Sequence, residues 1–221
     1  MKNYRYVKNI VDFVLSIFIL LVLLPFIAMN AFVLAIMLRA NPFLIQLRGI
    51  TKENKVFKII KFRTIKLSAG RKSLEKNIFY KPSLEKYIPA YCRWLRKTGL
   101  DEIPQLINVM KGEMSLIGPR PLMMSDLDLL KEEGKAYYTK RNTLKVKPGI
   151  TGLWQTSGRR EDGFENLINL DAEYDEKVSI MIDVRIFVKT IPLVLRGMHS
   201  DAIIYGMSEY SSSVKLDVDM I

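Results

Sequence analysis

The chain has 221 residues, 49% of them hydrophobic, and its 34 lysines and arginines against 23 aspartates and glutamates give a net charge of +11. This length suffices for one domain with its own core, and the charge suits a polyanionic partner such as an anionic membrane, a phosphorylated substrate or a nucleic acid. A single cysteine excludes an internal disulfide, and a single histidine excludes any mechanism or zinc site that needs two.

The hydrophobic residues are concentrated near the N-terminus. Residues 13–38 carry no charge, and only Ser16, Pro25 and Asn30 interrupt the apolar run. The run exceeds the roughly 20 residues that span a bilayer and is too long for a cleavable signal peptide. Basic residues flank both ends, so the charge distribution gives no clear orientation. We expect a segment that enters the membrane, either as a spanning helix or as a helix kinked at Pro25 whose ends face the same side.

Two extended segments follow, and they are predicted to pair as a hairpin: residues 43–48 and 56–63. Alternation along the second segment would place Lys61 and Arg63 on the same face. Two cations on one face either hold a diphosphate or belong to a solvated basic surface. In the aromatic stretch that comes next, Cys92 is expected to be a small packing residue rather than a nucleophile.

A central stretch places two adjacent carboxylates, Asp101 and Glu102, before an apolar run with helical spacing. Pro104 fits the first turn of a helix, so the carboxylates are expected at the positive end of the helix dipole, which favours their ionised form. Arg96 precedes them, and Arg120 follows in a Gly-Pro-Arg-Pro turn. Such a pattern is typical of chemistry on a phosphate held by a divalent metal ion. The alternative is that Asp101 caps the helix and Glu102 only interacts with its dipole.

The C-terminal half is predicted to be helical. Residues 122–145 and 164–177 have amphipathic helical patterns, and residues 178–196 are predicted to form a helix that lies on the membrane or closes the core. Between the first two segments, Gly149 and Gly152 allow a close approach of backbone to backbone.

Three blocks, in this order, resemble the motifs of one family. Residues 61–64 (Lys-Phe-Arg-Thr) are similar to its Lys-Phe-Arg-Thr-Met block, with Ile65 in place of methionine. Residues 100–121 carry its core motif, Leu-Asp-Glu-Ile-Pro-Gln-Leu-Ile-Asn-Val-Met-Lys-Gly-Glu-Met-Ser-Leu-Ile-Gly-Pro-Arg-Pro, and residues 147–152 match its Arg-Pro-Gly-Ile-Thr-Gly block, opened here by lysine. Over about residues 5–195 the chain thus resembles the bacterial sugar transferases, the monotopic polyprenyl-phosphate phosphoglycosyl transferases.

The resemblance implies an α+β, predominantly helical fold at the bacterial inner (cytoplasmic) membrane. Residues 1–40 would form a re-entrant membrane helix kinked at Pro25, although Leu24 stands where many relatives have a serine. Residues 41–200 would form one catalytic domain on the cytoplasmic face, with amphipathic helices on the membrane surface. Residues 201–221 are expected to be a loose tail.

The resemblance also implies a reaction, in which a sugar-1-phosphate moves from a nucleoside diphosphate sugar, UDP-linked, to a polyprenyl (undecaprenyl) phosphate. This is the first membrane step in the synthesis of a surface glycan such as an exopolysaccharide or lipopolysaccharide. Asp101 is the implied nucleophile, giving a phosphosugar-aspartyl intermediate, and Glu102 is the implied ligand of Mg²⁺. Asp171, in an Asp-x-x-Tyr element, either assists the metal, orients an arginine or forms a structural salt bridge. The implied phosphate-binding residues are Lys61, Arg63, Arg96, Arg120 and Arg159.

Two other classes of protein remain open. A basic, membrane-anchored binding protein would use its charge for lipids, and changing Asp101 would not weaken its binding. A nucleic-acid binder also suits the charge, but the sequence has no zinc finger, recognition helix or RNA-binding signature, so we expect no nucleic acid as partner. The sequence specifies neither the sugar nor the oligomeric state.

Overall fold

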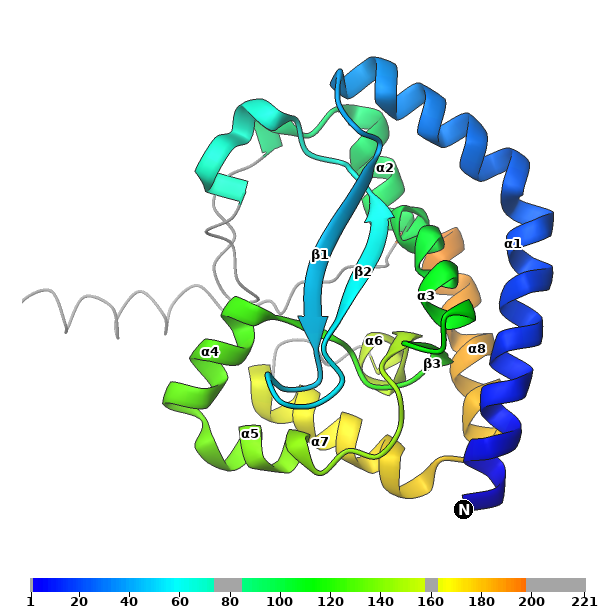
Figure 1. Cartoon of the computed structure of the whole chain (residues 1–221), viewed down its shortest axis with the longest axis vertical. Helices are drawn as coiled ribbons and strands as arrows, with labels where there is room; N and C mark the ends of the chain where they lie inside the picture. The colour runs from blue at the N-terminus through cyan, green and yellow to red at the C-terminus, as the bar shows by residue number, and fades with distance from the viewer. Residues whose placement is uncertain (1, 74–84, 158–162, 198–221) are drawn as a thin grey trace, which may run out of the picture.

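The protein is mostly helical, with short strands at its centre and one long helix along its edge (Figure 1). The computed structural model describes residues 2–73, 85–157 and 163–197. The predominantly helical α+β class predicted from the sequence is confirmed. The helices are α1 (Lys2–Leu38), α2 (Ala90–Thr98), α3 (Leu106–Met110), α4 (Met124–Glu133), α5 (Lys135–Asn142), α6 (Leu153–Thr156), α7 (Gly163–Lys177) and α8 (Ile180–Leu195). The 3₁₀ segments are η1 (Leu67–Ser73), η2 (Glu85–Tyr87) and η3 (Leu100–Gln105), and the strands are β1 (Phe43–Gly49), β2 (Phe57–Phe62), β3 (Ser115–Ile117), β4 (Leu122–Met123) and β5 (Gly149–Thr151).

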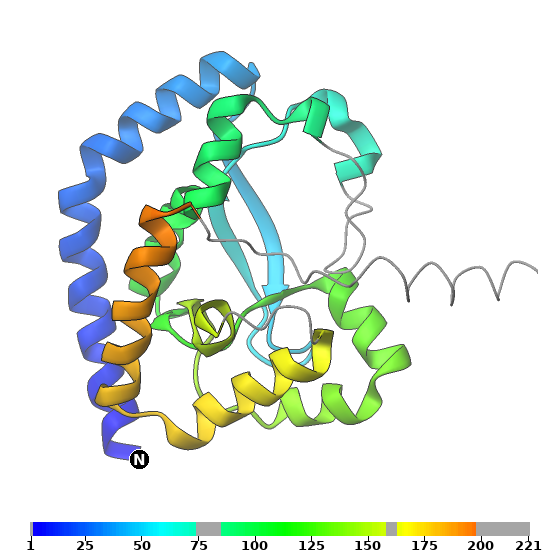
Figure 2. The same cartoon turned by 180° about the vertical axis from the view of Figure 1, so that it is seen from behind.

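The long helix α1 has 37 residues and is long and apolar enough to cross a membrane. Pro25 lies inside it, where the missing N–H removes one helical hydrogen bond without ending the helix. The kink predicted at this proline is therefore a curve in a continuous helix rather than a break. Both views show the C-terminal part of α1 leaning over the body toward β1 (Figures 1 and 2).

Polar residues near the start of α1 attach the helix to the body. The ammonium of Lys8 lies 2.7 Å from a carboxylate oxygen of Asp183 on α8 and 3.3 Å from one of Asp12. Asp12 in turn accepts a hydrogen bond from the hydroxyl of Ser115, the first residue of β3. Tyr174 on α7 donates to the second oxygen of Asp183 at 2.7 Å. All these groups are buried, so the start of α1 is bonded to the elements that lead into the centre of the protein.

A second attachment lies near the end of α1. Asn30 is fully buried there, and its amide donates to the carbonyl of Phe26 while its oxygen accepts from the hydroxyl of Tyr91 on α2 at 2.6 Å. Leu34 packs with Cys92 in the same apolar cluster. Cys92 is thus a buried packing residue, as predicted, and burial raises the pKa of its thiol to about 11, which leaves it protonated at neutral pH.

The predicted hairpin is confirmed by the antiparallel pairing of β1 and β2, in which Phe43 lies opposite Phe62 and Arg48 opposite Phe57. β4 adds to the other edge of β1, and β3 pairs with β5 in parallel. Alternation along β2 buries Ile59 and Lys61 on the same face. The hairpin therefore presents a lysine to the interior from an otherwise apolar strand face.

The C-terminal helices lie where they were predicted, except that one predicted segment is divided into two helices. The helical segment predicted for residues 122–145 is two helices, α4 and α5, which meet at Gly134. The other two predicted helices are α7 and α8. α8 lies beside α1 (Figures 1 and 2) and exposes apolar side chains such as Val184 and Phe187. Two neighbouring helices thus present apolar side chains on the same edge of the protein.

Candidate active site at the Asp101–Glu102 turn

The two adjacent carboxylates lie in the 3₁₀ helix η3, directly after α2. Gly99 separates these helices with φ 72°, a left-handed conformation that favours glycine. Gly99 is also the N-cap of η3, without a side-chain cap, so the alternative in which Asp101 caps the helix is wrong. Pro104 lies inside this first turn, as predicted. Asp101 and Glu102 are 6% and 7% exposed, and such burial of adjacent carboxylates is costly unless charged groups compensate them.

Compensating cations lie beside Glu102, around a small opening between the hairpin and the Gly-Pro-Arg-Pro turn. The lining includes three cations and one carboxylate, namely Arg48, Lys61, Arg120 and Glu102. The structure therefore brings together Lys61, Glu102 and Arg120, three of the residues selected from the sequence, and adds Arg48. The excess of positive charge suits a ligand with several negative charges, such as a diphosphate.

Asp101, on η3, and Arg96, on α2, both lie near Cys92. Both act electrostatically on the buried thiol of Cys92, which places them around the same residue. The guanidinium of Arg96 donates to the hydroxyl of Thr64 at 3.1 Å. Thr64 belongs to the Lys-Phe-Arg-Thr block, so this hydrogen bond ties that block to the helix that precedes the two carboxylates.

Arg63 is less central than its neighbour Lys61. β2 ends at Phe62, and the guanidinium of Arg63 donates to the backbone carbonyl of Asn41 at 2.9 Å, close to the end of α1. Arg63 thus lies directly after β2 and, unlike Lys61, is not among the residues that line the opening. Arg159 lies outside the residues that the structure describes.

The turn that carries Arg120 packs against the Lys-Pro-Gly-Ile-Thr-Gly block through bare backbone. A Cβ atom on Gly149 would lie 2.1 Å from the amide nitrogen of Gly118, and one on Gly152 would lie 2.2 Å from the Gly118 carbonyl oxygen. Gly118 donates to the carbonyl of Thr151, and Gly149 donates to that of Pro119, both at 2.9 Å. The predicted close approach is confirmed, and it holds the base of the Arg120 turn in place.

The Arg120 side chain lies with its guanidinium carbon 5.7 Å from the centroid of the Trp154 ring, within the range of a cation–π interaction. Trp154 is completely buried, so it packs in the core beneath the arginine. An aromatic support of this kind orients a guanidinium.

Arg141, on α5, is a residue that the sequence did not single out. It is fully buried and donates to Asp171 at 2.6 Å, to the carbonyl of Arg120 at 2.6 Å and to that of Ile50 at 2.8 Å. Burial raises the pKa of Asp171 to about 6, and the positive charge of Arg141 opposes this rise. Of the roles open to Asp171, this geometry matches the structural salt bridge: Asp171 pairs with the buried Arg141, which also donates to the backbone of the Arg120 turn.

The donor groups available for a metal ion are few. Among the described residues, no cluster of three histidine, cysteine, aspartate or glutamate side chains is placed to hold an ion. Mg²⁺ in enzymes that act on phosphates is usually bound by one or two carboxylates together with the substrate's phosphate oxygens, so it does not need such a cluster. Glu102, a carboxylate beside an opening lined by cations, fits this mode of binding, whereas Asp171 is engaged by Arg141.

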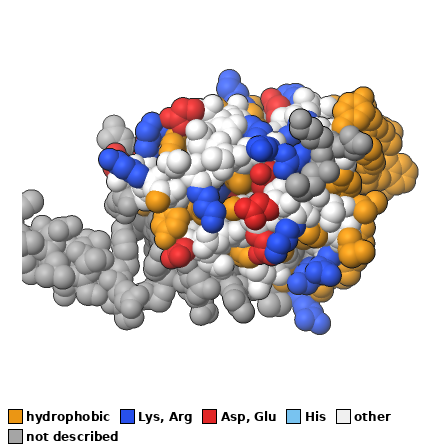
Figure 3. Space-filling model, turned by 90° about the horizontal axis from the view of Figure 1, so that it is seen from below, with side chains coloured by type: hydrophobic (Ala, Val, Ile, Leu, Met, Phe, Trp, Pro, Cys, Tyr) orange, Lys and Arg blue, Asp and Glu red, His pale blue; other side chains and the backbone are white. Residues whose placement is uncertain are grey.

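The surface separates into apolar and charged regions. Figure 3 shows hydrophobic side chains along the edge formed by α1, while acidic and basic side chains are spread over the rest of that face. The exposed apolar residues of α1 include Val14, Phe18, Leu21 and Phe32. An apolar edge of this size marks a surface for a membrane or a partner.

Comparison with known proteins gives the family. Residues 3–197 match the family model described as bacterial sugar transferase. The chain is 31% identical over 208 residues to undecaprenyl-phosphate galactose phosphotransferase of Salmonella typhimurium, a match that covers 88% of this chain and 42% of that protein. It is 32% identical over 193 residues to UDP-glucose:undecaprenyl-phosphate glucose-1-phosphate transferase of Escherichia coli K12 (85% and 40% covered).

A relative of more similar length is the exopolysaccharide production protein ExoY of Sinorhizobium fredii, which is 34% identical over 165 residues, covering 66% of this chain and 67% of that protein. The chain therefore spans less than half of the first two relatives and about two thirds of the third. The family model covers nearly the whole chain, including both carboxylates and the Arg120 turn. The chain belongs to the bacterial sugar transferase family.

Proposed function

We propose that the protein transfers a sugar-1-phosphate from a UDP-sugar to undecaprenyl phosphate, as an early step in the synthesis of a surface glycan. The observation that carries the proposal is the buried Asp101–Glu102 turn beside an opening lined by three cations, in a chain whose first helix is apolar enough for a membrane. The names of the relatives, which include galactose and glucose phosphotransferases of undecaprenyl phosphate, support this choice of substrates.

The proposed reaction has two displacements at one phosphorus atom. A carboxylate oxygen of Asp101 attacks the phosphorus that bears the sugar, and the bond to the bridging oxygen breaks, so that UMP leaves. An oxygen of the lipid phosphate then attacks the same phosphorus and displaces the Asp101 carboxylate. Covalent catalysis of this kind divides one displacement between two anions into two easier steps.

The proposed role of the cations is to bind the phosphate groups of the donor. Lys61, Arg48 and Arg120 line the opening, and we assign them to the diphosphate of the donor, whose charge they reduce. Glu102 is assigned to Mg²⁺, which when bound supplies further charge neutralisation of the leaving phosphate. Asp101 lies on the adjacent side of the same 3₁₀ turn, so the nucleophile and the proposed metal ligand are fixed by one backbone segment.

The proposed membrane arrangement is monotopic, with both ends of α1 on the cytoplasmic side of the inner membrane. Lys8 and Asp12 near the start of α1, and Asn30 near its end, bond to the same body. A helix that crossed the bilayer and separated its two ends could not make both sets of hydrogen bonds at once. This argument supports the re-entrant arrangement over the spanning one.

The topology is tested by placing a single cysteine near either end of α1, in one variant at Lys2 and in another at Asn41. In intact spheroplasts, a membrane-impermeant maleimide is expected to label neither site, and both should react after permeabilisation. The native Cys92 gives little background because it is buried. Labelling of one site alone in intact spheroplasts would establish a spanning helix and contradict the monotopic proposal.

The reaction is tested with the full chain in nanodiscs, incubated with Mg²⁺ and a panel of UDP-sugars without lipid acceptor. Intact-protein mass spectrometry is expected to show a gain of one sugar-phosphate, with release of an equal amount of UMP. Chelation of Mg²⁺ should reduce UMP release by about 100-fold or more, because the leaving UMP phosphate loses the neutralising charge of the metal ion. The absence of both adduct and transfer to undecaprenyl phosphate across the panel would favour a non-catalytic binding protein.

A further inference from the structure

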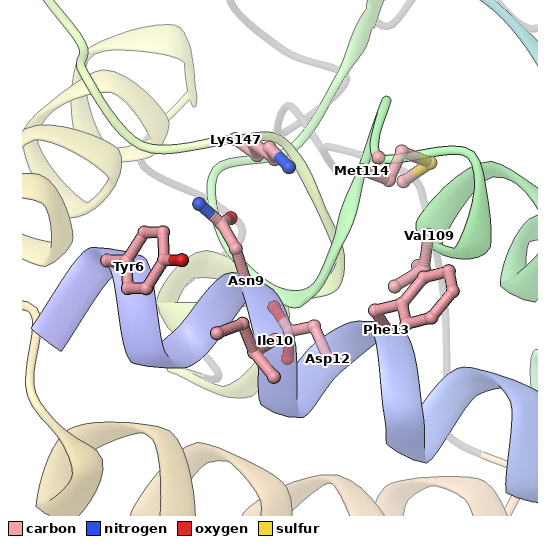
Figure 4. Close-up of a pocket in the computed structure, with 9 residues that line it drawn as sticks. Tyr6, Asn9, Ile10, Asp12, Phe13, Val109, Met114 and Lys147 are labelled. Atoms are coloured by element: carbon pink, nitrogen blue, oxygen red, sulfur yellow. The ribbon is translucent and has the colours of Figure 1, made fainter.

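A second cavity, of about 320 Å³, lies between the first turns of α1 and the segment around α3 (Figure 4). α1 contributes Tyr6, Asn9, Ile10 and Phe13, and Val109 and Lys147 face them from the body. We refer to this cavity as the α1 groove. It is distinct from the opening beside Glu102, and the two share no lining residue.

The α1 groove is open toward the apolar edge of the protein. Tyr6, Ile10 and Phe13 are 70%, 49% and 45% exposed, and their spacing places them on one face of the helix. Exposed apolar residues continue along α1 through Val14 and Phe18. A hydrocarbon chain in the bilayer can therefore enter the groove from the membrane without crossing water.

A cation lies at the polar end of this apolar groove. Lys147 is partly buried, and its ammonium lies over the backbone of Gly112, 3.6 Å from where a Cβ atom would be. No ion pair of Lys147 is found within the described parts of the chain. The side-chain amide of Asn9 points toward Lys147 (Figure 4). A partly buried ammonium and a neighbouring amide beside an apolar cavity suit a phosphate attached to a hydrocarbon chain.

The groove also contains a carboxylate, which opposes an anionic ligand unless it is neutralised. Asp12 is engaged by the ammonium of Lys8 at 3.3 Å and by the hydroxyl of Ser115. Lys8 is shared with Asp183, at 2.7 Å, so the hydroxyls of Ser115 and Tyr174 also help to stabilise this pair of carboxylates. These groups turn the Asp12 carboxylate toward the attachment of α1, and Lys147 is the cation that lines the groove.

The α1 groove and the opening beside Glu102 are lined by residues of one apolar cluster. Val109 and Met114, which line the groove, belong to the same cluster as Ile59, which lines the opening, and Ile150 packs against that cluster. Gly149, two residues after Lys147, lines the opening. A phosphate on Lys147 would thus lie next to the backbone block that supports the Arg120 turn.

We propose that the α1 groove binds the acceptor lipid, with the phosphate of polyprenyl phosphate on Lys147 and its first isoprene units along Ile10 and Phe13. This inference rests on the proposed function and assigns its second substrate to a site. The chemistry on the donor side, at Asp101 and the opening beside Glu102, remains separate. Loss of Lys147 therefore impairs the second displacement and spares the first.

The test uses the full chain in nanodiscs and measures the two displacements separately. For Lys147→Met, we expect the rate of the phosphosugar adduct to stay within about twofold of wild type, while the KM for polyprenyl phosphate rises about 10- to 100-fold, as expected for the loss of one charge-assisted hydrogen bond. Lys147→Arg should restore most of the lost affinity. The matched control is Lys145→Met, which removes an exposed lysine two positions earlier and is expected to leave both steps unchanged.

Direct lipid binding is measured by native mass spectrometry with polyprenyl phosphate, and with phosphatidylglycerol as competitor. We expect Lys147→Met to lose polyprenyl phosphate and a tenfold excess of phosphatidylglycerol not to displace it from wild type. An equal slowing of adduct formation would place Lys147 in the donor site, and equal displacement by phosphatidylglycerol would make the groove a general phospholipid site; either result overturns the proposal. If wild type forms no adduct, the proposed function fails, whereas the binding measurement still decides on the groove.

Discussion

Asp101→Asn is expected to abolish formation of the phosphosugar adduct and to lower turnover by about a thousandfold or more, as is usual when a covalent nucleophile is removed. The amide preserves the size of the buried side chain but has no anionic oxygen with which to attack phosphorus. The measurement combines intact-protein mass with the initial rate of UMP release at saturating UDP-sugar and Mg²⁺.

The matched control is Asp128→Asn, which makes the same chemical change on α4 at a side chain that is 51% exposed and paired with Lys52 on the surface. Its turnover should equal that of wild type. Glu102→Gln separates the two roles within the turn: it should weaken the dependence on Mg²⁺ while the adduct still forms slowly at Asp101. Turnover at the wild-type rate in Asp101→Asn would show that the nucleophile is another group.

Arg141→Met is expected to lower the free energy of unfolding by about 3–5 kcal/mol, because it leaves the carboxylate of Asp171 buried without its partner. Both side chains are at most 1% exposed. The carbonyls of Ile50 and Arg120 also lose their guanidinium donor. The loss is measured by thermal unfolding of the protein in detergent. A destabilisation of this size should lower the unfolding temperature by about 10 °C.

Two further variants show whether the unpaired charge is the cause. In the double variant Arg141→Met with Asp171→Leu, no charge remains uncompensated, and stability should recover in part. Lys140→Met removes an exposed neighbour on the same helix, whose ammonium binds Asn169, and should leave the midpoint unchanged. Equal midpoints for Arg141→Met and Lys140→Met would mean that the buried pair does not stabilise the fold.

Local features of the candidate site were predictable from the sequence. Pro104 after two carboxylates indicated a first helical turn, and the structure has one, although it is a 3₁₀ turn that begins at Leu100 rather than an α-helix. The two glycines of the Lys-Pro-Gly-Ile-Thr-Gly block indicated close backbone packing, which Gly118 provides. These signals depend on backbone conformation over a few residues, which the residue type largely determines.

Features that depend on distant partners were not predictable. Arg141 lies in a stretch of exposed-looking polar residues, and only the tertiary fold brings it to Asp171, 30 positions away. The end of β2 at Phe62, which separates Arg63 from Lys61, is set by pairing with β1 and not by the sequence of the strand itself. Hydropathy identified α1, but the alternative between spanning and re-entrant forms depends on hydrogen bonds at its ends that no local pattern contains.

The bond between Lys8 and Asp183 joins residues 175 positions apart, which has a consequence for biosynthesis. At about 5–20 residues per second, the ribosome needs roughly 10–35 s to reach Asp183 after Lys8 has been made. During that interval, the apolar helix can enter the membrane while its lysine has only Asp12, one turn away, as a counter-ion. Lys8 and Asp12 can thus form an ion pair with each other early in translation. Once α8 has been made, Asp183 can bind Lys8 and attach α1 to the rest of the domain.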